Sequence, residues 1–220
     1  MSADPIEIPA GLAAGYRRFR RERYAAEAER YRALASGQRP RTMVIACADS
    51  RADPATIFSA APGELFVVRN VAALVPPFEE GGGYHGTSAA IEFAVTELAV
   101  PDIVVMGHGL CGGIAAALAE RPKGRFIGPW VELLAGLRDE LLQVAQDLDL
   151  TARHKLFEQM AVLYSLQNLA SFPFVAAAIE AGRLRLHGAW FAIAEGELEW
   201  LEGRSGRFQP VASLPAWAGP

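Results

Sequence analysis

The sequence contains little of three things that would assign it to a class at once: cysteine, long apolar runs and net positive charge. Its 220 residues include two cysteines, too few for a fold held together by disulfides. No apolar run reaches the roughly 18–20 residues of a membrane-spanning helix, so we expect no membrane partner. With 21 Lys and Arg against 25 Asp and Glu, the formal net charge is −4. We therefore expect no general affinity for nucleic acid.

The first nine residues lack the basic and apolar segments of a signal peptide. Two cysteines without a leader indicate a reducing compartment, so we expect a cytoplasmic protein whose cysteines bind a metal or act in catalysis. Residues 15–36 have the spacing of an amphipathic helix with an arginine cluster. This cluster could be a nucleic-acid patch, but glutamates interleave with it. That mixture favours a solvated face or an arm that packs on a partner subunit.

What the sequence does contain is a regular alternation of short apolar runs with helical patterns. Apolar runs at 43–46, 65–68, 103–106 and 184–193 predict buried strands, and helical spacing predicts helices between them, including one over residues 130–148. Asp53, followed by Pro54, is expected to be the N-cap of a short helix. The pattern predicts an α/β fold with a mostly parallel central β-sheet flanked by helices. Residues 198–201 are a possible fifth, antiparallel strand. We expect a single domain over residues 1–220, in which residues 1–37 form an N-terminal helical arm.

Chemically reactive side chains follow two of these predicted strands. Cys47 ends the first apolar run, and Asp49 and Arg51 follow it at alternate positions. The run at 103–106 leads into His108 and Cys111. In open α/β sheets, sites form beyond the carboxyl ends of the strands, so we expect these residues to meet there.

Cys47, His108 and Cys111 provide the thiolate and imidazole ligands that zinc prefers. Three firm protein ligands leave a fourth position for water, as in a catalytic site. Two buried free cysteines in the core are one alternative, and a redox pair is another. Both are less favoured, because the cysteines are far apart in sequence and lie among a carboxylate, a histidine and several glycines.

Asp49 and Arg51 are spaced so that their side chains can point the same way and pair. The pair could simply fix the loop. It could also hold Asp49 away from the metal, so that the carboxylate accepts a hydrogen bond from metal-bound water. The converse is open too, in which Asp49 swings in as a fourth ligand and closes the site.

Three motifs together resemble the β-class carbonic anhydrases: Cys47-Ala-Asp-Ser-Arg51, Pro62-Gly-Glu-Leu-Phe-Val-Val-Arg-Asn70 and Gly107-His-Gly-Leu-Cys-Gly-Gly113. The resemblance implies one zinc ion per chain on Cys47, His108 and Cys111. It also implies reversible hydration of carbon dioxide to bicarbonate and a proton. The attacking group would be a zinc-bound hydroxide that the Asp49–Arg51 dyad orients.

The resemblance also implies a substrate pocket and a subtype. The pocket residues would be Gln38, Phe66, Val71, Phe93 and Gly109, with Phe93 in a place that often holds tyrosine. Some bacterial members have a bicarbonate pocket that locks the aspartate onto zinc, and it needs a tryptophan, an arginine and a tyrosine. Here Val44, Arg69 and Phe191 occupy those places. We therefore expect the plant-like, non-allosteric subtype, with an open site at neutral pH.

The same resemblance implies the sheet order 2-1-3-4 and an N-terminal helix that embraces a second subunit, giving a homodimer or a higher homo-oligomer. Two other functions remain open. One is a catalytically silent relative that keeps zinc for structure, and the other is hydrolysis of a small carbon–sulfur compound. His85 is either a proton shuttle or a loop histidine at a subunit interface.

Overall fold

The computed structural model describes residues 7–81, 83–119 and 124–213. The chain divides into two compact units, Met1–Arg39 and Pro40–Pro220. The prediction of one domain with an arm at residues 1–37 stays a prediction, and each unit is described by itself below.

The first unit is helical from Ala10 to Leu34. It consists of α1 (Ala10–Arg18), the π-helical turn η1 (Phe19–Tyr24) and α2 (Ala25–Leu34). The helix thus begins earlier than the predicted Gly15. None of the residues in these three segments is buried. Four aromatic rings contact one another along the helix: Tyr16, Phe19, Tyr24 and Tyr31.

The second unit is built on a six-stranded sheet in the order β2-β1-β3-β4-β5-β6. The strands are β1 (Thr42–Cys47), β2 (Leu65–Asn70), β3 (Asp102–His108), β4 (Arg185–Ala192), β5 (Glu197–Glu202) and β6 (Arg207–Pro210). The first four are parallel and the last two antiparallel. The predicted order 2-1-3-4 and the antiparallel fifth strand are confirmed. The sixth strand was not predicted, because its four residues end in proline and carry no clear alternation.

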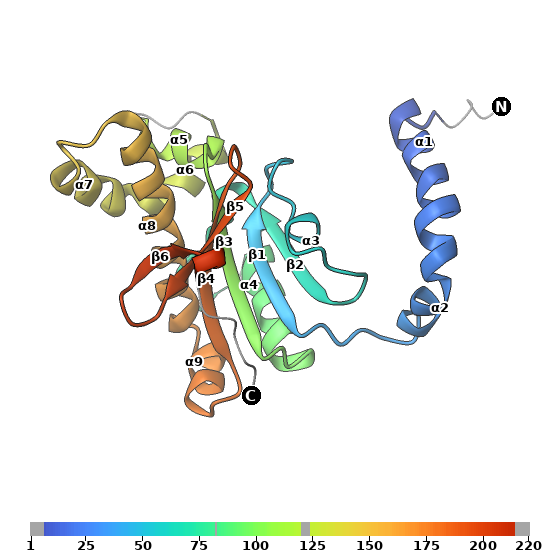
Figure 1. Cartoon of the computed structure of the whole chain (residues 1–220). Helices are drawn as coiled ribbons and strands as arrows, with labels where there is room; N and C mark the ends of the chain where they lie inside the picture. The colour runs from blue at the N-terminus through green and yellow to red at the C-terminus, as the bar shows by residue number, and fades with distance from the viewer. Residues whose placement is uncertain (1–6, 82, 120–123, 214–220) are drawn as a thin grey trace, which may run out of the picture. The chain divides into compact units, whose positions relative to one another are not determined.

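Helices flank this sheet (Figure 1). They are α3 (Pro54–Ile57), η2 (Val71–Ala73), α4 (Gly86–Glu92), η3 (Phe93–Glu97), α5 (Gly112–Leu118), α6 (Ile127–Val131), η4 (Glu132–Leu134), α7 (Ala135–Val144), α8 (Leu150–Ser171), α9 (Pro173–Glu180) and η5 (Val211–Ser213). One helix prediction was wrong: residues 130–148 do not form a single helix. The chain breaks at Leu134, which leaves helical geometry (φ −96°, ψ 9°) with its side chain fully buried.

The core explains why β1 is a continuous apolar run: both faces of the strand are buried. Met43 and Ile45 pack on one face of the sheet with residues of α4, α8 and α9. Val44 and Ala46 pack on the other face, against residues around α3 and on β5. A parallel strand covered on both faces has no polar side. Because β1 and β3 are paired in parallel, their carboxyl ends reach the same edge of the sheet.

Among the described residues, no single helix is long and apolar enough to cross a membrane. The helices α8 and α9 meet that test only as a pair, across a bend of 87°.

Candidate metal centre and active site

Three possible metal ligands meet at the carboxyl edge of the sheet. Cys47 is the last residue of β1, His108 is the last of β3, and Cys111 directly precedes α5. Their ligand atoms all lie within 4.8 Å of one another, and all three side chains are buried. The two sulfurs are 3.9 Å apart. A tetrahedral zinc with bonds of about 2.3 Å to sulfur would set them about 3.8 Å apart, so the cysteine pair fits zinc.

The His108 ring presents a free lone pair to this cluster. Its Nδ1 lies 2.9 Å from the carbonyl oxygen of Gly109, and we assign the proton to Nδ1, which donates. Within the described part of the chain, the buried Nε2 has no hydrogen-bond partner. An unpartnered buried nitrogen is costly, and metal ligation would satisfy it, with the second nitrogen bonded to a carbonyl as is usual for such histidines.

The groups around Cys47 favour its thiolate, the form that binds a metal. A hydrogen bond from Cys111 lowers the pKa of Cys47 and raises that of Cys111, and the backbone N–H groups of Asp49 and Ala72 lower the pKa of Cys47 further. Ala72 and Ala73 both have positive φ angles, 66° and 57°. Such strained alanines occur where the surrounding structure imposes them, often at functional sites.

Asp49 and Arg51 form the pair that their spacing predicts. Arg51 Nε donates to Asp49 Oδ1 at 3.0 Å, Nη2 donates to Oδ2 at 2.8 Å, and the Arg51 backbone N–H also donates to Oδ1. These bonds hold the pKa of Asp49 well below its usual range. Asp49 Oδ2 lies 3.9 Å from His108 Nε2, which places the carboxylate beside the ligand cluster. Arg51 also donates to the carbonyl of Leu110 at 3.0 Å, so it joins the two ligand-bearing loops.

Arg69 has a role that the sequence did not indicate. Its guanidinium donates to the carbonyl oxygens of Cys47, Asp49 and Ala52 and forms an ion pair with Asp53. It therefore clamps the whole loop from Cys47 to Asp53. Its position at the end of β2, next to Ala46 of β1, was the available signal.

Glu158 and Trp190 were also missed. Glu158 is a carboxylate on α8 with 3% of its surface exposed, and Trp190 on β4 has 5% exposed. Glu158 lies on the buried face of α8 with Ala161 and Val162. Because helical spacing predicts that face, a carboxylate on it could have been noticed as unusual. Both contact the loop that bears His108 and Cys111.

Four of the five predicted substrate-pocket residues belong to the second unit. Phe66 and Phe93 contact each other, with ring centroids 5.8 Å apart. Val71 borders Gly113 at the start of α5, and Gly109 packs on Trp190. Gln38 belongs to the first unit. That these five residues bind substrate stays a prediction.

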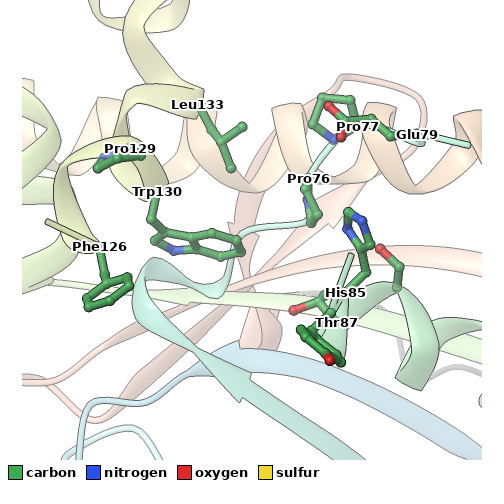
Figure 2. Close-up of a pocket in the computed structure, with 12 residues that line it drawn as sticks. Pro76, Pro77, Glu79, His85, Thr87, Phe126, Pro129, Trp130 and Leu133 are labelled. Atoms are coloured by element: carbon green, nitrogen blue, oxygen red, sulfur yellow. The ribbon is translucent and has the colours of Figure 1, made fainter. Parts of the chain in front are cut away.

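A separate pocket of about 370 Å³ lies beside the segment after β2. Figure 2 shows the rings of Phe126 and Trp130 on one side and Pro76 and His85 on the other. Trp130 donates to the carbonyl of Val71 at 2.8 Å. This is where the structure places His85, the residue considered as a proton shuttle.

The mostly parallel sheet and the buried Cys-His-Cys cluster at its carboxyl edge define an α/β protein with a cluster of side chains that could hold a metal ion. A family model described as carbonic anhydrase matches residues 42–198. The chain belongs to the β-class carbonic anhydrases, which are lyases.

Individual relatives agree with this assignment. A carbonic anhydrase of Pseudomonas aeruginosa is 38% identical over 208 residues, which are 91% of each chain. The structure of the β-carbonic anhydrase CcaA is similar with a TM-score of 0.85 and 30% identity, covering 91% of this chain and 90% of that one. One of two tetrameric β-carbonic anhydrases of Sordaria macrospora has a TM-score of 0.74 and 31% identity, covering 90% and 94%.

Proposed function

We propose that this chain catalyses the zinc-dependent reversible hydration of carbon dioxide to bicarbonate, and that Asp49 and Arg51 orient the attacking water. Membership of the family supports the reaction. The observation that carries the mechanism is the position of the Arg51-bound Asp49 carboxylate, 3.9 Å from the unpartnered Nε2 of His108.

Cys47 Sγ, Cys111 Sγ and His108 Nε2 would hold the ion. Bound there, zinc supplies a Lewis acid that lowers the pKa of a water molecule to about 7. Asp49 is a hydrogen-bond acceptor whose direction is fixed by three bonds from Arg51. By accepting a hydrogen bond from the attacking water, Asp49 would turn a lone pair of that water toward the carbon of the substrate. Because the water is already oriented, less entropy is lost on reaching the transition state, and the barrier is lower.

We further propose that the site lacks the bicarbonate lock. An anion pocket at Arg69 would need free guanidinium donors, whereas the guanidinium of Arg69, which has five N–H groups, already makes four hydrogen bonds, to three carbonyls and Asp53. Val44 is fully buried and apolar, so it offers an anion no donor. Both observations support an Asp49 that stays on Arg51 at neutral pH.

We propose a homo-oligomer as the working form. Support comes from the tetrameric relatives of Sordaria macrospora. It also comes from the first unit, because none of the residues in its helical segments is buried. The predicted dimer is the smallest such assembly.

Stopped-flow carbon dioxide hydration by the zinc-loaded protein, with metal analysis, tests the proposal. We expect turnover and about one zinc per chain in the wild type, because the three ligands hold one ion. Cys111→Ser should retain almost no zinc and no activity. A zinc-loaded wild type without hydratase activity would contradict the proposed reaction, and a wild type without zinc would contradict the metal centre.

A further inference from the structure

The loop from His108 to Cys111 is bonded to a buried carboxylate, that of Glu158. Glu158 Oε1 accepts a hydrogen bond from the backbone N–H of Cys111 at 3.0 Å, and Oε2 accepts one from Trp190 Nε1–H at 3.1 Å. Glu158 comes 47 residues after Cys111 along the chain. Its side chain thus ties α8 to the backbone of a ligand and to β4.

The loop needs such support because its own geometry is strained. Leu110 has a φ of 55°, a conformation that non-glycine residues rarely adopt, and its side chain is exposed. The indole of Trp190 packs closely against two glycines of this segment. A Cβ added to Gly109 would lie 3.1 Å from Trp190 Cζ2, and a Cβ added to Gly107 would lie 3.5 Å from Trp190 Cδ1. The carboxylate and the indole together fix the path of the loop.

A carboxylate is unfavourable at this position, because the position is buried. Burying an ionised group is unfavourable unless it is paired, and among the described residues Glu158 has no ion-pair partner within 4.0 Å. The nearby Lys155 bonds to Glu199 at 2.6 Å and lies over the Trp190 ring. An apolar side chain would avoid the cost, but it would leave the Cys111 and Trp190 N–H groups without an acceptor.

We propose that Glu158 is a positioning residue of the metal centre: by anchoring the Cys111 backbone N–H and the Trp190 indole, it holds the Cys111 sulfur in the arrangement that binds the ion. Residues that orient ligands typically change metal affinity 10–100-fold when altered. The inference rests on the proposed metal centre, and metal binding by the wild type tests that centre separately.

The test compares Glu158→Leu, which removes both acceptors, with Glu158→Gln, whose amide oxygen keeps one. Glu199→Gln is a matched control, since Glu199 is a carboxylate with 9% exposure that bonds Lys155 and Gln159. Zinc affinity is measured by chelator competition. The cobalt-substituted proteins report ligand geometry through their thiolate charge-transfer absorption, and urea unfolding reports stability.

We expect Glu158→Leu to bind zinc about 10–100-fold more weakly and to shift the cobalt spectrum. Glu158→Gln should show a smaller loss, a partial rescue. Glu199→Gln should lower the urea midpoint and leave zinc affinity and the cobalt spectrum unchanged. If Glu158→Leu matched Glu199→Gln in all three measurements, Glu158 would be merely structural. Should Glu158→Leu fail to fold, wild-type affinity and spectrum in Glu158→Gln would overturn the proposal.

Discussion

At the scale of single residues, Asp49 gives the sharpest test of the mechanism. Asp49→Asn keeps the size of the side chain, but an amide NH2 would face the Arg51 donors and one acceptor oxygen would be lost. We expect kcat/KM for carbon dioxide hydration to fall on the order of 10²-fold or more, with zinc content unchanged, as measured by stopped flow and metal analysis.

Asp102 provides the matched control for that substitution. It pairs with Arg185 through the same two-pronged geometry, at 2.8 and 2.9 Å, but it begins β3, and His108 ends it. Asp102→Asn should leave kcat/KM and zinc content as in the wild type. Equal activity losses in both variants would mean that Asp49 acts only on the stability of the fold.

The lowered pKa of Asp102 leads us to expect that the free energy of unfolding depends on pH. Burial raises the pKa of this carboxyl, but hydrogen bonds from Arg185 and His187 outweigh it, and the net pKa is lowered. Its stabilisation is therefore complete above the ordinary pKa of about 3.9 and is lost as the pH falls through the lower pKa of the folded state. The difference in urea midpoint between wild type and Asp102→Asn should be large at pH 7 and shrink below pH 4. A difference that grows below pH 4 would contradict this sign.

The sequence predicted those residues of the candidate site that lie directly after strands. Cys47, Asp49 and Arg51 follow β1, His108 ends β3, and the structure brings them together with Cys111. Parallel pairing explains this success, since it places strand ends side by side. The positions of Arg69 and Glu158 could have been noticed, but their roles could not be predicted in this way, because both bind backbone groups of distant loops, and a sequence does not show which backbone groups a side chain will meet.

At the scale of elements, the close approach of α5 to the strained segment after β2 leaves no room for a larger side chain. A Cβ on Gly113 would lie 2.7 Å from Val71 Cγ1 and 2.9 Å from the Cβ of Ala72, whereas one on Gly112 would meet nothing within 4 Å. Gly113→Ala should lower the free energy of unfolding by about 1–3 kcal/mol. It should also weaken zinc binding, because Ala72 donates to Cys47.

Gly112→Ala is the paired control, with a change in stability within about 1 kcal/mol. Urea unfolding and chelator competition on both variants measure the difference. The prediction would be wrong if the two substitutions had the same effect on zinc affinity.

Elements with a clear period were predicted well, and those set by tertiary packing were not. The predicted N-cap at Asp53 is confirmed by its bond to the Thr56 N–H, and the four predicted parallel strands are all present. The segment 130–148 has helical spacing, yet the helix is interrupted at Leu134, whose side chain is fully buried. That break depends on what covers the helix, which local sequence does not state.

At the scale of the whole molecule, the described residues of the first unit, 7–39, form no core of their own. A single helix is marginal in water without tertiary packing, yet this one carries contacting rings at Phe19, Tyr24 and Tyr31 and none of its residues is buried. Such a helix needs an apolar surface to pack on, and in a homo-oligomer a second copy can supply it.

We therefore expect Tyr24→Ala combined with Tyr31→Ala to lower the number of subunits in the assembly, because the change removes two aromatic rings in mutual contact and with them apolar area that association could bury. Light scattering during size-exclusion chromatography measures the mass. Glu29→Ala changes an exposed residue on the same helix and should leave the mass as in the wild type. If the double variant kept the wild-type mass, the assembly would have to be held through surfaces of the second unit, and the first unit would have another role.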